Sequence, residues 1–216
     1  MTAVLFDMDG VLVDSEDYWV DFQREQVHPE TVPDADVDLA ETSGMNFREI
    51  YDSLEAEYST AISREEWIER FEAAAEEIYR DRVEALEGLH DLLAELDDRG
   101  VTTALVSSSP RDWIGMVVER FDLEGAFDEV ISADDIDAAS KPAPDVYEHA
   151  AREVELPPEE CVAVEDSENG VEAASRAGTT VIAYRIGAHG DIDLSPADVV
   201  VETPGELREA VLRSVF

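Results

Sequence analysis

Residues 3–10 read Ala-Val-Leu-Phe-Asp-Met-Asp-Gly, four apolar residues that lead directly into an acidic turn. This pattern predicts a buried strand over residues 3–6 and a turn at Gly10. Asp7 and Asp9 are two residues apart, so in extended chain their side chains point to the same side. Open α/β sheets bind their ligands at the carboxyl ends of the strands. We therefore expect the two carboxylates at a ligand-binding edge.

From residue 86 onward, helical and strand patterns alternate, which is typical of βαβ units and a parallel sheet covered by helices. The first strand completes this sheet, so the predicted fold class is α/β, a Rossmann-like doubly wound core. The expected helices are 88–99, 111–121, 145–154, 169–177 and 204–212, and the expected strands are 103–106, 129–132, 161–164, 179–183 and 198–201.

Between the first strand and this alternation, the pattern is helical. Residues 14–27, 47–58 and 63–83 are predicted helices, and Ser63 and Glu66 have the spacing of a capping box. Trp67 and Phe71 recur at a helical interval and are expected in the core. We predict a core domain of residues 1–15 and 85–216 with an inserted α-helical cap domain, residues 16–84.

The charge is extreme, because 54 acidic residues face 15 basic ones and the formal net charge is −39. With 44% hydrophobic residues the chain can still bury a core, so disorder is not expected. Self-repulsion on this scale is screened in molar salt, where the Debye length is about 3 Å. We interpret the composition as an adaptation to a salt-rich cytoplasm in a halophile. An acidic surface also argues against nucleic acid and anionic membranes as partners.

No basic region followed by a long apolar segment begins the chain, and no run of about 18 apolar residues occurs. The expected location is therefore cytoplasmic, and the expected assembly is a monomer or small homo-oligomer. Cys161 is the single cysteine and lies within an apolar run, so we expect a buried core residue rather than a nucleophile.

A pair of acidic residues two positions apart carries little information here, since it is expected roughly 13 times by chance. Its context is informative, because three more polar groups follow predicted strands or open helices at the same edge: Ser107-Ser-Ser109, Lys141 and Glu165-Asp166. Lys141 is the only lysine in the chain. Its retention indicates a role for a compact point charge that a planar guanidinium cannot fill.

Four segments in this order resemble the motifs of haloacid dehalogenase-like hydrolases, in particular the branch with a helical cap that includes phosphoglycolate phosphatases and β-phosphoglucomutases. They are Asp7-Met-Asp-Gly-Val-Leu-Val-Asp-Ser15, Ser107, Lys141-Pro-Ala-Pro-Asp-Val-Tyr147 and Glu165-Asp-Ser-Glu-Asn-Gly170, followed by Ala173-Ala174 and Ala177-Gly178. The resemblance spans the whole chain. One departure is Ser140, where relatives usually have glycine before the lysine.

The resemblance implies a Mg²⁺-dependent phosphatase that acts on a small phosphorylated metabolite. Asp7 would be the nucleophile that forms an aspartyl-phosphate, and Asp9 would carry the proton. Ser107, Ser108 and Lys141 would bind the phosphate. Mg²⁺ would be held by the carboxylates of Asp7 and Asp166, the Asp9 carbonyl and Glu165. In the cap, Gly44-Met-Asn-Phe-Arg48 resembles a substrate-facing loop, and Arg48 would meet a substrate carboxylate or second phosphate, although a solvated surface arginine fits equally well.

Three other functions share parts of this pattern. A hydrolytic dehalogenase uses the same nucleophile but lacks the second aspartate, because a halide leaves without a proton, and Asp9 argues against it. A β-phosphoglucomutase-like sugar-phosphate mutase keeps every core residue, so the sequence leaves it as an alternative. A non-catalytic module that binds Mg²⁺ or phosphate is the alternative of another class, since a fold does not prove turnover.

Overall fold

The protein is described by a computed structural model that covers residues 2–35, 37, 42–185, 187 and 192–216. Its centre is a six-stranded sheet in the order β3-β2-β1-β4-β5-β6, in which all adjacent strands are parallel. This confirms the predicted α/β class with a doubly wound parallel sheet. The strands are β1 (Ala3–Phe6), β2 (Thr102–Ser107), β3 (Glu129–Ser132), β4 (Cys161–Glu165), β5 (Thr180–Tyr184) and β6 (Val199–Val201).

Helices cover both faces of the sheet, because alternate residues of each strand point to opposite sides. In β1, Val4 and Phe6 join a cluster with apolar residues of α5 and α9, whereas Ala3 and Leu5 join a cluster with those of α7 and α8. Both clusters are buried, so the sheet is the core of the molecule. The helices around it are α5 (Leu89–Asp98), α6 (Arg111–Arg120), α7 (Asp145–Glu153), α8 (Glu168–Ala177) and α9 (Pro204–Val215).

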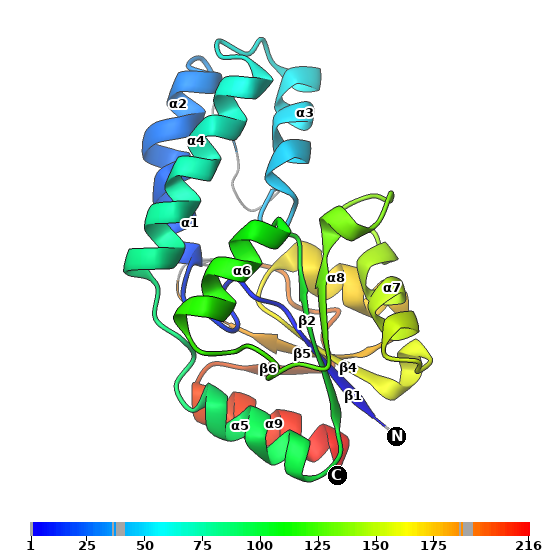
Figure 1. The fold of residues 1–216 in the computed structure, drawn as a ribbon. Helices are drawn as coiled ribbons and strands as arrows, with labels where there is room; N and C mark the ends of the chain where they lie inside the picture. The colour runs from blue at the N-terminus through cyan, green and yellow to red at the C-terminus, as the bar shows by residue number, and fades with distance from the viewer. Residues whose placement is uncertain (1, 36, 38–41, 186, 188–191) are drawn as a thin grey trace.

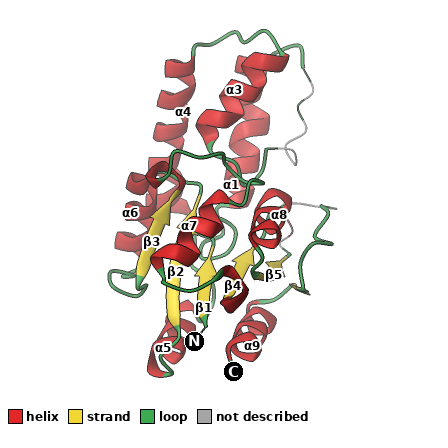
Figure 2. Ribbon diagram, turned by 90° about the vertical axis from the view of Figure 1, so that its right-hand side faces the viewer, coloured by secondary structure: helices red, strands yellow, loops and turns green. Residues whose placement is uncertain are grey.

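A second group of helices stands above the carboxyl ends of the strands (Figure 1; Figure 2). It consists of α1 (Glu16–Phe22) with a π-helical turn (Gln23–Val27) and α2 (His28–Thr31), then α3 (Phe47–Glu57), then α4 (Arg64–Glu77) with a second π-helical turn (Ile78–Arg82). Trp67 and Phe71 are buried among these helices, which confirms their predicted place in a core. The capping box also forms, since Ser63 N–H donates to Glu66 and Glu66 N–H donates to Ser63 Oγ.

The first of these helical segments ends at Thr31 rather than at the predicted residue 27. Pro29 made continuation improbable, because proline lacks an N–H and its ring clashes inside a regular helix. The widened turn at Gln23–Val27 ends two residues before Pro29 and accommodates it. Among the described residues, no helix is both long and apolar enough to cross a bilayer.

Candidate active site

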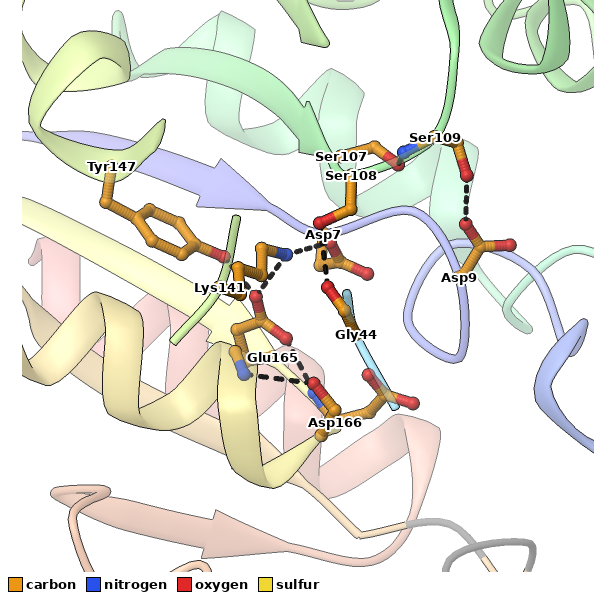
Figure 3. A network of polar contacts seen from close by, with 12 residues as sticks. Asp7, Asp9, Gly44, Ser107, Ser108, Ser109, Lys141, Tyr147, Glu165 and Asp166 are labelled. Atoms are coloured by element: carbon orange, nitrogen blue, oxygen red, sulfur yellow. Dashed lines mark hydrogen bonds and ion pairs between the residues drawn. The ribbon is translucent and has the colours of Figure 1, made fainter. Parts of the chain in front are cut away.

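The carboxyl ends of the central strands bring together the polar groups that the sequence places at one edge (Figure 3). Asp7 directly follows β1, and its N–H continues the pairing with β4 by donating to Val164 O at 3.0 Å. Ser107 and Glu165 are the last residues of β2 and β4. Because β1 pairs in register with both of these strands, the three side chains meet at the centre of the sheet.

Lys141 enters this centre from the loop before α7 and forms two buried ion pairs. Its Nζ donates to Asp7 Oδ1 and to Glu165 Oε1, each at 2.6 Å, and the lysine is only 2% exposed. Glu165 Oε1 also accepts a hydrogen bond from the Tyr147 hydroxyl, and its Oε2 accepts one from Asp166 N–H at 3.3 Å. Glu165 therefore fixes the position of the lysine that pairs with Asp7.

Burial and charge shift the protonation equilibria of this cluster. Burial raises the pKa of Asp7 well above its ordinary value, and Lys141 counteracts that rise. Burial lowers the pKa of Lys141, but the Asp7 and Glu165 carboxylates more than offset this, so its pKa lies above the ordinary value. Lys141 is thus held as a cation. Besides burial, the neighbouring carboxylates Glu165 and Asp166 raise the pKa of Asp7.

The cluster fits a divalent cation in both charge and donor chemistry. Asp7, Glu165 and Asp166 are all buried, and each offers an oxygen within 4.8 Å of the others. Ionised, they carry three negative charges against the single positive charge of Lys141, a deficit that a divalent ion would neutralise. Mg²⁺ takes oxygen ligands and is commonly held by one or two carboxylates together with substrate phosphate. The Asp9 side chain turns away from this group, so its predicted role as a ligand rests on its carbonyl.

Two glycines allow the backbone to approach these carboxylates. A Cβ on Gly10, which has φ +72°, would lie 1.8 Å from Asp166 Oδ2. A Cβ on Gly170, in the first turn of α8, would lie 2.0 Å from Glu165 Oε2. Because real atoms cannot approach so closely, any side chain at either position would displace a carboxylate of the cluster.

Asp9 is held by three hydroxyl groups on the other side of Asp7 (Figure 3 shows the contact with Ser109). Its Oδ1 accepts hydrogen bonds from Ser15 and Tyr79, both at 2.6 Å, and its Oδ2 accepts one from Ser109 at 2.8 Å. Ser107 Oγ accepts a hydrogen bond from Ser109 N–H at 3.0 Å, which orders the Ser107–Ser109 turn before α6. This turn therefore connects Ser107, the predicted phosphate-binding residue, to Ser109, which donates a hydrogen bond to Asp9.

The loop before α3 is joined to this turn by hydrogen bonds. Ser108 Oγ donates to Gly44 O at 2.7 Å, and Asn46 Nδ2 donates to Ser108 O at 3.1 Å. Ser140, the departure from the family pattern, has a structural role here, because its hydroxyl accepts a hydrogen bond from Asn46 N–H at 3.0 Å. A glycine at position 140 would lack this contact between the loop and the lysine-bearing segment.

A cavity of about 80 Å³ lies between the sheet edge and the overlying helices. Asp7, Asp9, Ser107, Ser108 and Asp166 line its floor, and residues of the overlying helices and of the loop before α3 line its walls. Those residues are Glu16, Trp19, Gln23, Met45, Phe47, Ile50 and Phe71, with Trp113 of α6 beside them.

Arg48 does not join this lining. Its guanidinium donates to Asp134 at 2.9 Å in a partly exposed ion pair and lies over the ring of Phe47. The structure thus brings Asp7, Asp9, Ser107, Ser108 and Asp166 together around one cavity. Lys141 and Glu165 join this group through the ion pairs of Lys141 with Asp7 and Glu165, and Arg48 lies outside the cavity.

Several residues at this site carried no predicted role. Ser15 and Tyr147 belong to the quoted motifs, so their position in the sequence was a usable signal. Ser109 belongs to the serine run after β2. Tyr79 had no such signal, since it lies in an amphipathic helical segment 70 residues from Asp9.

Comparison with known proteins identifies the family. Residues 4–184 match the haloacid dehalogenase-like hydrolase family. Hexitol phosphatase B of Escherichia coli (strain K12) is 33% identical over 180 residues, which cover 81% of this chain and 79% of that protein. A phosphorylated carbohydrates phosphatase of Thermotoga maritima is 29% identical over 178 residues, 82% of each chain.

Among solved structures, CbbY from Rhodobacter sphaeroides in complex with xylulose-(1,5)-bisphosphate superposes with a TM-score of 0.76 over 96% of each chain, at 24% identity. This likeness shows a shared fold. The family match extends from β1 to β5 and so includes all four motif segments. The chain therefore belongs to the haloacid dehalogenase-like hydrolases.

Proposed function

We propose that this protein is a Mg²⁺-dependent phosphatase that hydrolyses small phosphate monoesters through an aspartyl-phosphate on Asp7. The observation that carries the proposal is the pairing of Asp7 with the buried Lys141, next to Asp166 and at the floor of a cavity. The phosphatase names of relatives that share about a third of their residues with this chain support the same activity.

Asp7, Asp166 and the Asp9 carbonyl would hold the metal, with Glu165 beside them. Bound there, Mg²⁺ would neutralise charge as an anionic phosphate approaches an anionic nucleophile. Lys141 contributes a second positive charge from the protein itself. It binds one oxygen of Asp7, so the other oxygen can face the phosphorus atom.

In the first half-reaction, an Asp7 oxygen forms a bond to phosphorus while the bond from phosphorus to the leaving oxygen breaks. Asp9 donates a proton to that oxygen, and the alcohol leaves. The phosphoryl group is then bound to Asp7. In the second half-reaction, Asp9 accepts a proton from water as the water attacks phosphorus, and inorganic phosphate leaves with Asp7 restored.

The Ser107–Ser109 turn would orient the phosphate. Ser107 Oγ already accepts a hydrogen bond from Ser109 N–H, so the hydroxyl hydrogen of Ser107 is available to donate to a phosphate oxygen. The Ser108 N–H lies just before α6, where amide donors and the helix dipole favour anions. We further propose that residues 16–84 act as a cap that closes over this turn through the Ser108–Gly44 contact.

The test is release of inorganic phosphate from a panel of small phosphomonoesters in molar KCl with MgCl₂. We expect Asp7→Asn and Asp9→Asn to lose at least about 10²-fold in kcat, because each removes a group used in both half-reactions. Asp21→Asn, which changes an exposed carboxylate of α1, is the matched control and should retain activity.

Intact-mass measurement after rapid acid quench should show one phosphoryl group on the wild type and none on Asp7→Asn. A folded wild type that releases no phosphate from any ester would contradict the proposed function. Retained release in Asp7→Asn would exclude this residue as the nucleophile.

A further inference from the structure

We infer that the cavity accepts monoesters whose leaving group is neutral and carries hydroxyl groups, and that it discriminates against substrates with a second anionic group. The inference rests on the proposed function, since it concerns the leaving group of the same phosphate ester. It assigns Glu16 and Gln23 as specificity-determining residues. The sequence and the family resemblance gave neither residue a role.

The first observation is the lack of cations around the leaving group. Among the described residues that line the cavity there is neither lysine nor arginine. The residues outside the described ranges contain no lysine or arginine either. Lys141 forms ion pairs with Asp7 and Glu165 and does not line this cavity, and Arg48 is paired with Asp134 outside it. A second phosphate or a carboxylate on the substrate would therefore find no opposite charge.

The second observation is that the cavity already contains negative charge above its floor. The Glu16 carboxylate is 9% exposed and lines the cavity, and its Oε1 accepts a hydrogen bond from Ser43 Oγ at 2.7 Å. Like charges brought close together repel, so an anionic leaving group is disfavoured.

The third observation is a hydrogen-bond acceptor without a donor. Gln23 is one of the residues that line the same cavity, and its Oε1 is buried and has no hydrogen-bond partner among the described residues. A buried polar atom left unpaired costs free energy, and a ligand that pairs with it recovers that cost. Gln23 Oε1 and the Glu16 carboxylate both accept hydrogen bonds, and an alcohol O–H can donate them.

The remaining walls are aromatic and closely packed. The rings of Trp19 and Trp113 stack with centroids 5.2 Å apart, and Phe47 stacks on Trp113 at 4.8 Å. Such fixed rings offer apolar faces to the C–H groups of a polyol while the acceptors bind its hydroxyls. A sugar-phosphate mutase must hold a bisphosphate, which this lining does not favour.

The decisive experiment compares esters that differ only in the group remote from phosphorus. We expect kcat/KM for 2-hydroxyethyl phosphate to exceed that for 2-phosphoglycolate by at least roughly tenfold, and glycerol 3-phosphate to exceed 3-phosphoglycerate similarly. Equal or faster hydrolysis of the two phospho-acids would overturn the inference while leaving the proposed phosphatase intact.

Two variants test the assigned residues. Glu16→Gln should narrow the preference for 2-hydroxyethyl phosphate over 2-phosphoglycolate by roughly three- to tenfold, whereas Asp17→Asn, the same change on an exposed neighbour in α1, should not. Gln23→Leu should lower kcat/KM roughly three- to tenfold more for 2-hydroxyethyl phosphate than for ethyl phosphate, since ethyl phosphate has no hydroxyl to donate. Gln26→Leu is its exposed control.

A binding measurement separates this inference from the proposed function. With Asp7→Asn, which should not turn over, 2-hydroxyethyl phosphate should raise the unfolding midpoint more than 2-phosphoglycolate at equal concentration in MgCl₂. If the wild type hydrolyses no ester, not even p-nitrophenyl phosphate, the proposed function fails, and this binding preference still decides the inference. Stronger stabilisation by 2-phosphoglycolate would overturn it.

Discussion

The hydroxyl of Tyr79 donates a hydrogen bond to the Asp9 carboxylate across 70 residues of sequence, with 2.6 Å between the oxygens. Trp19 Nε1 in turn donates to the Tyr79 oxygen at 3.2 Å. Burial raises the pKa of Tyr79 well above its ordinary value, and the adjacent Asp9 raises it further, so the phenol stays a donor. The position of Asp9 thus depends on helices outside the sheet.

We predict that Tyr79→Phe lowers kcat for alkyl phosphates roughly three- to tenfold, because it removes one of the donors that position Asp9. The loss should be smaller for p-nitrophenyl phosphate, since p-nitrophenolate leaves without needing a proton. Comparison of kcat for the two esters measures this directly. An equal loss for both would mean that Tyr79 does not act through proton transfer.

Tyr51→Phe is the matched control for this variant. Tyr51 of α3 is also buried, and its hydroxyl donates a hydrogen bond to Ile62 O at 2.9 Å rather than to Asp9. Both substitutions should cost about 1 kcal/mol of folding free energy for the lost hydrogen bond. Only Tyr79→Phe should change kcat.

Lys141→Met should abolish phosphate release and destabilise the fold. Removal of the ammonium leaves Asp7, Glu165 and Asp166 without their buried counter-ion, and breaking a buried pair in this way costs about 3–5 kcal/mol. Lys141→Arg keeps the positive charge but changes the size and shape of the group, and we expect it to lower kcat at least about 10²-fold. Arg213→Lys, on an exposed pair, should change neither activity nor the urea midpoint.

Millimolar MgCl₂ should raise the unfolding midpoint of the wild type in molar KCl, where general screening is already saturated. A ligand at 100 times its Kd stabilises the native state by about 2.7 kcal/mol. Asp166→Asn should lose most of this increment, because it removes one carboxylate of the buried cluster. Asp112→Asn, on an exposed residue of α6, should keep it. An equal increment in both variants would place the ion elsewhere.

His28 should make the fold less stable in mild acid. Burial lowers its pKa from 6.5 to about 4, and its ring stacks on Trp67. Because the folded pKa is the lower one, the unfolded chain binds the proton more tightly, so stability falls as pH drops from about 6.5 towards 4. The loss by pH 5 is on the order of 2 kcal/mol. Urea unfolding of the wild type and of His28→Gln at pH 7.5 and pH 5 measures this loss of folding stability. The loss between the two pH values should be smaller in the variant by about the same amount.

We also propose that the protein works in concentrated salt. If each of the 15 basic residues neutralises one acidic residue, 39 carboxylates remain unneutralised. Salt weakens both the repulsion among these carboxylates and the attraction in surface ion pairs, and the repulsion is the larger of the two. The unfolding midpoint should therefore rise steadily with KCl. Sucrose of equal osmolarity is the control for solvent effects, because it does not screen charge. A midpoint that is independent of KCl would contradict the proposal.

Much of the fold and of the site floor could be predicted from local sequence. Apolar strands such as Ala3–Phe6, followed by Asp7 and Asp9, specify buried parallel strands with polar groups at their carboxyl ends. Because parallel strands align those ends, the sequence predicts that Asp7, Ser107 and Glu165 lie at one edge of the sheet, and the pairing of β1 with β2 and β4 brings them together there. The single lysine, Lys141, was recognisable by the absence of any other in the chain.

Tertiary structure alone decided which groups the overlying helices direct into the site. An amphipathic pattern shows that a helix has a buried face, but it does not show which strand end or loop that face meets. For this reason the contact between Tyr79 and Asp9, the unpaired oxygen of Gln23 and the turning of Arg48 towards Asp134 were not predictable. Sequence determined the chemistry of the floor, because which polar residue directly follows each apolar strand is a local property of the chain. Packing of the helices against the sheet determined what that floor faces, because it depends on contacts between residues far apart in the chain.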